Sequence, residues 1–149
     1  TSLSVAYAYR LAEMGHRVLL VDLDAQGHAT RHMGIEGEHC EHTLYDVLVD
    51  RIPLSSALVA TPLGEFDLVP SNLGMSTIDM ALMPMAAREF KLKRALDEVA
   101  DRYEFIIHRS EHRSSAWPSA AQAARGQPAS QRPGWSRPAW RPRPPCAPA

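Results

Sequence analysis

The chain has 149 residues, of which 45% are hydrophobic and 22% are charged, and this composition fits one soluble globular domain of ordinary size. No apolar run approaches the roughly 20 residues that a membrane span needs, and the start of the chain lacks the basic region and long apolar core of a secretory signal. The two cysteines, Cys40 and Cys146, lie in regions of different composition. We therefore expect a reduced cytoplasmic protein without a disulfide framework and without a membrane partner.

The formal net charge of −1 conceals two oppositely charged segments. From Arg109 to Ala149, seven arginines against the single acid Glu111 give a charge of +6. The preceding part holds the other nine basic and sixteen acidic residues, which gives −7. This asymmetry is the first sign that the chain contains two segments of different kinds.

The first predicted elements are a helix, a strand and a second helix. Apolar and small residues from Val5 to Met14 recur at helical spacing, and Gly15 is a natural stop for this helix. The short apolar run from Arg17 to Asp22 predicts a central parallel strand, because such a strand is buried on both faces. A short helix follows from Thr43 to Val49, with Thr43 as its N-cap.

Three further elements complete the predicted folded segment. Phe66 to Pro70 reads as a strand that proline ends, and Arg88 to Ala100 reads as an amphipathic helix. Tyr103 to Ile107 begins another strand. Because helices alternate with short apolar strands, we predict an α/β fold in which a parallel sheet carries helices on both faces. Residues 1–107 form this predicted domain.

Residues 108–149 are different in kind. They contain no Ile, Leu, Val, Met, Phe or Tyr, but eight of the twelve prolines and all three tryptophans. With so few aliphatic side chains, the segment cannot offset a backbone ordering cost of about 1–2 kcal/mol per residue. We predict a disordered tail rich in Arg, Pro and Ala, with polyproline-like stretches near Arg141 to Pro145.

Several motifs in the first segment occur in the order known from one family. Residues 11–30 read LAEMGHRVLLVDLDAQGHAT, and this run resembles the ParA/Soj branch of deviant Walker-A ATPases. It departs from the family pattern at Ala25, where Pro is usual, and at His28, where Asn is usual. Four later runs also resemble family segments: Thr43 to Leu48, Leu68 to Asn72, Arg88 to Leu96, and Asp101 to Ile107. Several motifs in order are more specific than a single loop match.

The resemblance implies an incomplete P-loop NTPase-like sheet that binds ATP and Mg²⁺ and transfers a phosphoryl group to water. It places Thr1 on the Mg²⁺ ligand that follows the phosphate-binding loop, with Ser2 beside it at the phosphates. Asp24 corresponds to the acid that orients the attacking water, and Asp22 is expected near the metal and nucleotide. The plainer alternatives are that Thr1 and Ser2 only cap a helix, and that the two aspartates only cap a turn.

The resemblance also implies what this sequence lacks. The family's loop glycines, phosphate-binding Lys and cross-dimer Lys have no counterpart, and Ala6 stands where the family usually has Asn. We therefore expect the polypeptide of this sequence to lack ATPase activity, although members of the family hydrolyse ATP. The implied partners are a second copy in a dimer, DNA bound without sequence preference, and a protein on a centromere-like site, with location at the nucleoid. The alternative is a non-catalytic interaction fragment that associates through exposed sheet edges.

Two hypotheses cover the change after Ile107. The family continues this strand with an apolar residue and Asp, whereas this chain has His108 and Arg109. Because codon degeneracy allows Ile-Asp in a shifted reading frame, one hypothesis is a frameshift. The other is a real basic arm with interleaved tryptophans, which suits weak, salt-sensitive contact with nucleic acid.

Three groups of residues suggest sites but have simpler explanations. Glu38 to His42 resembles a metal cluster, yet no second Cys/His pair lies at finger-like spacing, so a polar loop is favoured. His28 and His32 have helical spacing but no third ligand, which favours a solvated face. The remaining group is methionine-rich and is expected to fill gaps in the core rather than form a soft binding surface: Met75, Met80, Met83 and Met85.

Overall fold

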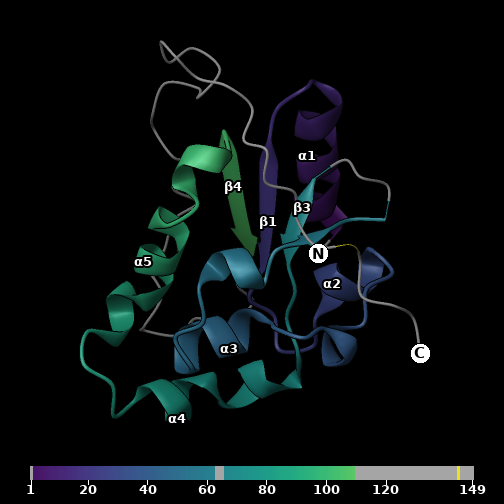
Figure 1. Cartoon of the computed structure of the whole chain (residues 1–149). Coiled ribbons are helices and arrows are strands. Elements are labelled where there is room, and N and C mark those ends of the chain that lie inside the picture. Colours follow the sequence, from purple (N-terminus) through teal and green to yellow (C-terminus); the bar gives the residue numbers. More distant parts are fainter. Residues whose placement is uncertain (1, 63–65, 110–143, 145–149) are drawn as a thin grey trace.

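In the computed structural model, which describes residues 2–62, 66–109 and 144, the chain forms a four-stranded sheet (Figure 1). The strands lie in the order β2-β3-β1-β4, with β3, β1 and β4 mutually parallel and β2 antiparallel to β3. Their bounds are β1 Val18–Asp22, β2 Val59–Ala60, β3 Asp67–Val69 and β4 Phe105–Arg109. The predicted α/β fold is confirmed. The antiparallel β2 was not predicted, because a strand of two residues leaves no readable pattern.

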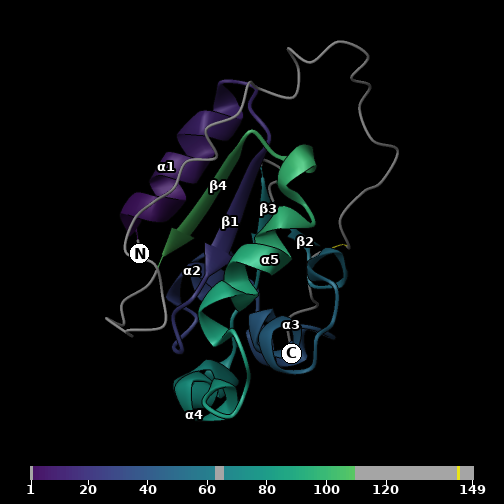
Figure 2. The same ribbon diagram turned by 90° about the vertical axis from the view of Figure 1, so that its left-hand side faces the viewer.

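Helices cover both faces of the sheet, as predicted (Figures 1 and 2). Successive residues of a strand point to opposite faces, and β1 is buried along its whole length. Val18 and Leu20 belong to the core shared with α1 and α2, whereas Leu19 and Val21 belong to the core shared with α3, α4 and α5. The helices are α1 Ser2–Glu13, α2 His28–His32, α3 Leu44–Val49, α4 Ile78–Leu82 and α5 Lys91–Asp97.

Local signals define the ends of α1 and α3. After α1 ends at Glu13, Gly15 takes a φ of 86°, a left-handed value that glycine adopts without steric cost. Thr43 caps α3 in a capping box, in which its backbone N–H donates to Asp46 Oδ2 at 2.6 Å. Both predicted boundaries are therefore confirmed.

The helix predicted from Arg88 to Ala100 is wrong as one continuous element. It consists of the 3₁₀ turn Arg88–Phe90, then α5, then the 3₁₀ turn Ala100–Arg102. The Val99 N–H donates to the Leu96 carbonyl at 3.1 Å, a three-residue spacing that tightens the chain after α5. Short 3₁₀ turns at helix ends leave the hydrophobic spacing nearly unchanged, so the sequence pattern could not reveal them.

The expectation that the methionines fill core gaps holds for only part of the group. Met75 is buried and Met85 packs against the core, whereas Met80 and Met83 are exposed. Both exposed side chains lie in or directly after the short helix α4, which turns Ile78 and Leu82 into the core instead. A helix of this length has room for only one buried face.

The strand β4 extends two residues past the predicted domain boundary, because His108 and Arg109 continue its pairing with β1. Residues 110–143 and 145–149 lie outside the described residues, so the disordered tail stays a prediction. Within the described part, no helix is long and apolar enough to cross a membrane.

A partly buried hydrogen bond joins β3 to the segment before β4. The Tyr103 hydroxyl donates to Asp67 Oδ2 at 2.6 Å. Burial raises the pKa of Asp67 above its usual value, and the bond from Tyr103 partly opposes that rise. Because the folded pKa is raised, the stability that Asp67 contributes is present below its unfolded pKa and is lost as the pH rises through the folded pKa.

We expect Tyr103→Phe to lower the free energy of unfolding by about 1 kcal/mol at neutral pH. Removing the hydroxyl raises the pKa of Asp67 further, so the loss should be larger at pH 7 than at pH 4. Urea unfolding at both pH values measures this difference, and Tyr7→Phe on the exposed face of α1 is the control. An equal loss at both values would show that the hydroxyl does not interact with the Asp67 carboxylate.

Candidate functional site at the carboxyl edge of the sheet

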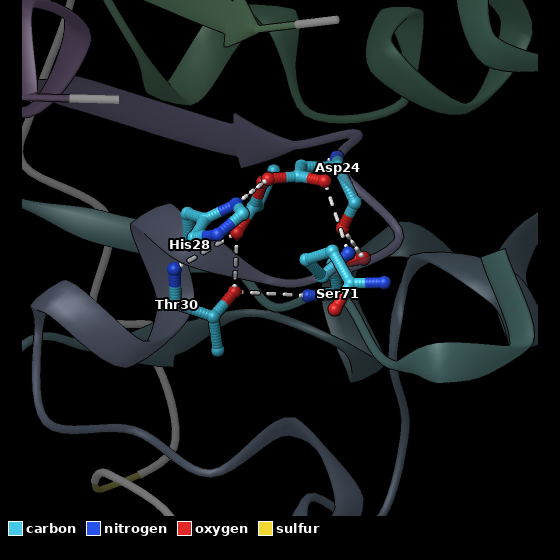
Figure 3. Close-up of polar contacts among 6 residues, drawn as sticks. Asp24, His28, Thr30 and Ser71 are labelled. Atoms are coloured by element: carbon cyan, nitrogen blue, oxygen red, sulfur yellow. Dashed lines mark hydrogen bonds and ion pairs between the residues drawn. The ribbon is translucent and has the colours of Figure 1, made fainter. Parts of the chain in front are cut away.

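Polar side chains gather where β1 and β3 end (Figure 3). Asp22 is the last residue of β1, Asp24 follows in the turn to α2, and Ser71 follows β3 after Pro70. Because β1 and β3 are parallel, their carboxyl ends meet at one edge of the sheet, where ligands bind in open α/β sheets. Asp22 and Asp24 therefore lie at the carboxyl edge of the sheet, which is where the sequence predicts them.

Asp22 holds the turn and the helix α2 in place. Its side chain is fully buried, and its Oδ2 accepts hydrogen bonds from the Thr30 backbone N–H at 2.8 Å and the Thr30 hydroxyl at 2.7 Å. Its Oδ1 accepts from the Asp24 backbone N–H at 3.2 Å. A buried carboxylate with these three donors links the end of β1 to α2.

Thr30 and Ser71 extend this network to β3, although sequence reasoning assigned neither a role. The Ser71 N–H donates to the Thr30 hydroxyl oxygen at 3.1 Å, and the Ser71 hydroxyl donates to the Asp24 carbonyl at 2.6 Å. Both side chains are almost completely buried. The only sequence signal was that each lies in a segment resembling the ParA/Soj pattern, because the hydroxyls are 41 residues apart in the chain.

Asp24 lies nearer the surface of the edge and contacts His28. Its Oδ1 accepts from the Gln26 N–H at 2.9 Å, and its Oδ2 contacts His28 Nδ1. Burial by itself raises the pKa of Asp24, but the hydrogen bond from Gln26 and the contact with His28 outweigh burial and hold the pKa below its usual value. The carboxylate is therefore charged at neutral pH.

His28 has a partner that the sequence did not suggest. Its side chain is 51% exposed, in keeping with the predicted solvated face, but its Nδ1 is turned towards Asp24 (Figure 3). His28 and Asp24 are four residues apart across the turn, and the left-handed Gly27 with φ 59° lies between them. This turn, rather than helical spacing with His32, decides what His28 contacts.

A second loop closes over the end of β3. A Cβ atom built on Gly37 would lie 1.8 Å from the Ser71 carbonyl oxygen, so only glycine fits there. Beside this contact, the Leu73 N–H donates to Glu38 Oε1 at 2.8 Å. A small polar pocket lies between this loop and α2, lined in part by Gln26, Arg31, Glu36 and Asn72.

Two predicted site residues receive no structural description. Thr1 lies outside the described residues, and α1 begins at Ser2, whose side chain is not described. Their contacts with Mg²⁺ and phosphate stay predictions. Among the side chains that the structure does describe, Asp22 and Asp24 lie close together.

The described residues do not by themselves fit a Mg²⁺ ion. Carboxylate oxygens are ligands that Mg²⁺ prefers, but both oxygens of Asp22 already accept protein hydrogen bonds in a fully buried site. Across residues 2–62 and 66–109, no group of three or more His, Cys, Asp or Glu side chains could hold a metal. Asp22 is thus compatible with a position near a metal but not with direct coordination in this arrangement.

Cys40 requires a correction to the cysteine prediction. The residue is disulfide-bonded, whereas the sequence composition indicated reduced cysteines. A disulfide requires two oxidised cysteines whose sulfur atoms meet in a specific geometry, and spacing along the chain does not report that geometry. The bond also removes the thiolate that the segment from Glu38 to His42 would have offered to a metal.

Residues 1–110 match the AAA domain family. The chain is 57% identical over 107 residues to the cell division protein PomZ of Myxococcus xanthus, covering 72% of this chain and 34% of PomZ. It is 40% identical over 107 residues to the sporulation initiation inhibitor protein Soj of Bacillus subtilis, covering 72% of this chain and 42% of Soj. The chain thus spans only about a third to two fifths of the length of these relatives.

The fold is also similar to a solved structure, cobyrinic acid a,c-diamide synthase from Mycobacterium smegmatis with bound ATP analog and magnesium. The TM-score is 0.67 at 36% sequence identity, and the match covers 71% of this chain and 43% of the synthase chain. The motifs, the sheet with its carboxyl-edge aspartates, and these similarities agree. The chain belongs to the AAA domain family and, within it, to the ParA/Soj-type partition ATPases.

Proposed function

We propose that this chain supplies part of an ATP-hydrolysing site of a partition ATPase, in which Asp24 orients the attacking water. The observation that carries the proposal is the charged Asp24 carboxylate at the carboxyl edge, held by the network of Asp22, Thr30 and Ser71. A rigid carboxylate at this edge is suited to positioning a water molecule. The similarity to the chromosome partitioning protein ParA of Caulobacter vibrioides, at 34% identity over 99 residues, supports the partition role.

The nucleotide and the partners belong to the same proposal. ATP and Mg²⁺ are supported by the similarity to the synthase with a bound ATP analog and magnesium. Thr1 and Ser2 are proposed to contact Mg²⁺ and the phosphates, and Asp22 to lie nearby. We further propose that the whole protein dimerises, binds DNA without sequence preference, meets a centromere-binding partner, and works in the cytoplasm at the nucleoid.

One observation favours a second candidate function, a non-catalytic interaction fragment. The strand β4 lies at the edge of the described sheet and pairs only with β1 there. An edge strand exposes backbone N–H and C=O groups that another chain can pair with. A fragment of this kind binds other protein chains and has no nucleotide site of its own.

Isothermal titration calorimetry of the purified chain with Mg-ATP distinguishes the two candidate functions. The enzyme proposal expects saturable Mg-ATP binding and slow phosphate release, in contrast to the expectation from the missing loop Lys that this chain is inactive. In Asp24→Asn, hydrolysis should fall by about 10²-fold with little change in affinity, because the group acts on the water. The exposed Asp50→Asn directly after α3 is the matched control and should behave as the unchanged chain does. A chain that folds but binds no Mg-ATP would refute the enzyme proposal and leave the interaction fragment.

A further inference from the structure

Asp24 and His28 differ sharply in their access to solvent. The Asp24 side chain is 6% exposed, whereas the His28 side chain is 51% exposed. One Asp24 oxygen accepts from the Gln26 N–H, and the other contacts His28 Nδ1. The imidazole is therefore the more solvent-accessible group of the pair.

The contact determines where the ring carries its proton. A charged carboxylate can only accept hydrogen bonds, so the nitrogen that faces it must be the donor. Histidine Nδ1 therefore carries a hydrogen, and the neutral ring must leave Nε2 as an unprotonated acceptor. The lowered pKa of Asp24 keeps its carboxylate in the charged form, which can only accept hydrogen bonds.

We infer that Asp24 and His28 form a dyad in which Asp24 holds the Nδ1 proton and His28 presents Nε2 as the base at this edge. In such pairs the buried carboxylate selects the tautomer and orients the ring, while the exposed nitrogen exchanges the proton. Asp24 then orients the attacking water through the His28 ring, so Asp24 is a positioning residue and His28 is the group that water reaches. The ParA/Soj pattern usually has Asn at this position, and an amide side chain cannot act as a base.

The inference rests on the proposed function in one respect: ATP hydrolysis makes the attacking water the donor of the proton that His28 accepts. In that reaction, the water oxygen forms a bond to the terminal phosphorus of a nucleoside triphosphate. The bond from that phosphorus to the bridging oxygen breaks and releases the nucleoside diphosphate. The proton of the attacking water passes to His28 Nε2, and the resulting imidazolium remains paired with the Asp24 carboxylate.

The chain contains a matched control for His28. His32 is four residues further along the same helix, α2, and is also exposed. Asp24→Asn is the informative variant, because asparagine is isosteric with aspartate. The Gln26 N–H requires the amide oxygen, so the amide NH₂ turns towards His28. An NH₂ group is a donor, so Nδ1 must become the acceptor and the hydrogen must move to Nε2.

Nitrogen-15 NMR of the histidine rings in alkaline buffer tests the dyad without any nucleotide. We expect His28 in the unchanged chain to be the Nδ1–H tautomer and His32 to be mostly the Nε2–H tautomer. In Asp24→Asn, His28 should change to Nε2–H while His32 stays the same. If His28 already matches His32 in the unchanged chain, the dyad does not exist.

Acylation by diethyl pyrocarbonate, located by mass spectrometry of the peptides, tests whether Nε2 is an available base. The rate at His28, relative to His32 in the same molecule, should fall several-fold in Asp24→Asn because Nε2 then carries a hydrogen. A relative rate that does not change would overturn the inference. His28→Ala supplies the identification of the modified peptide, and its unfolding midpoint shows whether the edge remains folded.

Hydrolysis separates this inference from the proposed function. If the chain hydrolyses Mg-ATP, His28→Gln should lower kcat by about 10²-fold with nucleotide affinity unchanged, and His32→Gln should change neither. Equal kcat in the two variants would remove His28 from the reaction even if the NMR result stands. If the chain binds no Mg-ATP, the proposed function fails, whereas the NMR and acylation results still decide whether the dyad exists.

Discussion

Replacing Asp22 with alanine is expected to destabilise the folded chain by about 3 kcal/mol or more, because three donors lose their acceptor. The Thr30 N–H, the Thr30 hydroxyl and the Asp24 N–H all point at this fully buried carboxylate. These donors are buried in the folded state, so each would carry the cost of leaving a buried polar group unpaired. Since a domain's total stability is about 5–15 kcal/mol, this loss should be large enough to populate the unfolded chain.

Urea unfolding followed by far-UV circular dichroism measures the effect through the transition midpoint. Asp22→Asn should be intermediate, because an amide has one acceptor oxygen for donors that approach both sides of the group. Asp50→Ala, at an exposed position directly after α3, is the control for losing a carboxylate. If Asp22→Ala and Asp50→Ala have the same midpoint, the network around Asp22 does not stabilise the fold.

Leu20→Ala is expected to cost about 2–5 kcal/mol, the range observed for truncating a large side chain in a packed core. Leu20 is completely buried in the centre of β1 and belongs to the core between the sheet and α1. β1 lies between β3 and β4, so neighbouring strands limit how far the structure can relax around the cavity. The cost should therefore be near the upper part of that range.

The matched control is Leu3→Ala, which removes the same atoms from a side chain that is 83% exposed on α1. It should change the free energy of unfolding by no more than about 0.5 kcal/mol. Thermal and urea unfolding of both variants, at one protein concentration, give the comparison. Similar values for the two leucines would mean that α1 does not pack on the β1 face as described.

The sequence predicted the parts of this protein that depend on neighbouring residues. The apolar run before Asp22 predicts a buried strand because a strand inside a sheet needs apolar side chains on both faces. Thr43 and Gly15 predict helix boundaries because capping and left-handed backbone are local requirements. Since a central parallel strand presents its last residues at the ligand-binding edge, the positions of Asp22 and Asp24 followed from the same local pattern.

Other features depended on residues distant in sequence. The bond between Thr30 and Ser71 forms only because β1 and β3 become neighbours in the sheet. The exposure of Met80 and Met83 depends on which face of α4 meets the core. No periodic pattern reports such contacts, because hydrophobic spacing describes one element at a time.

The sequence by itself therefore determined the α/β class, the central strand, the two aspartates at its end, and the resemblance that named the family. The tertiary structure alone decided that Asp22 is buried beneath Thr30 and that Asp24 meets His28 across the turn. The physical reason is that strand and helix propensities arise from local backbone and burial preferences, whereas the partner of a polar side chain depends on how the chain packs in space.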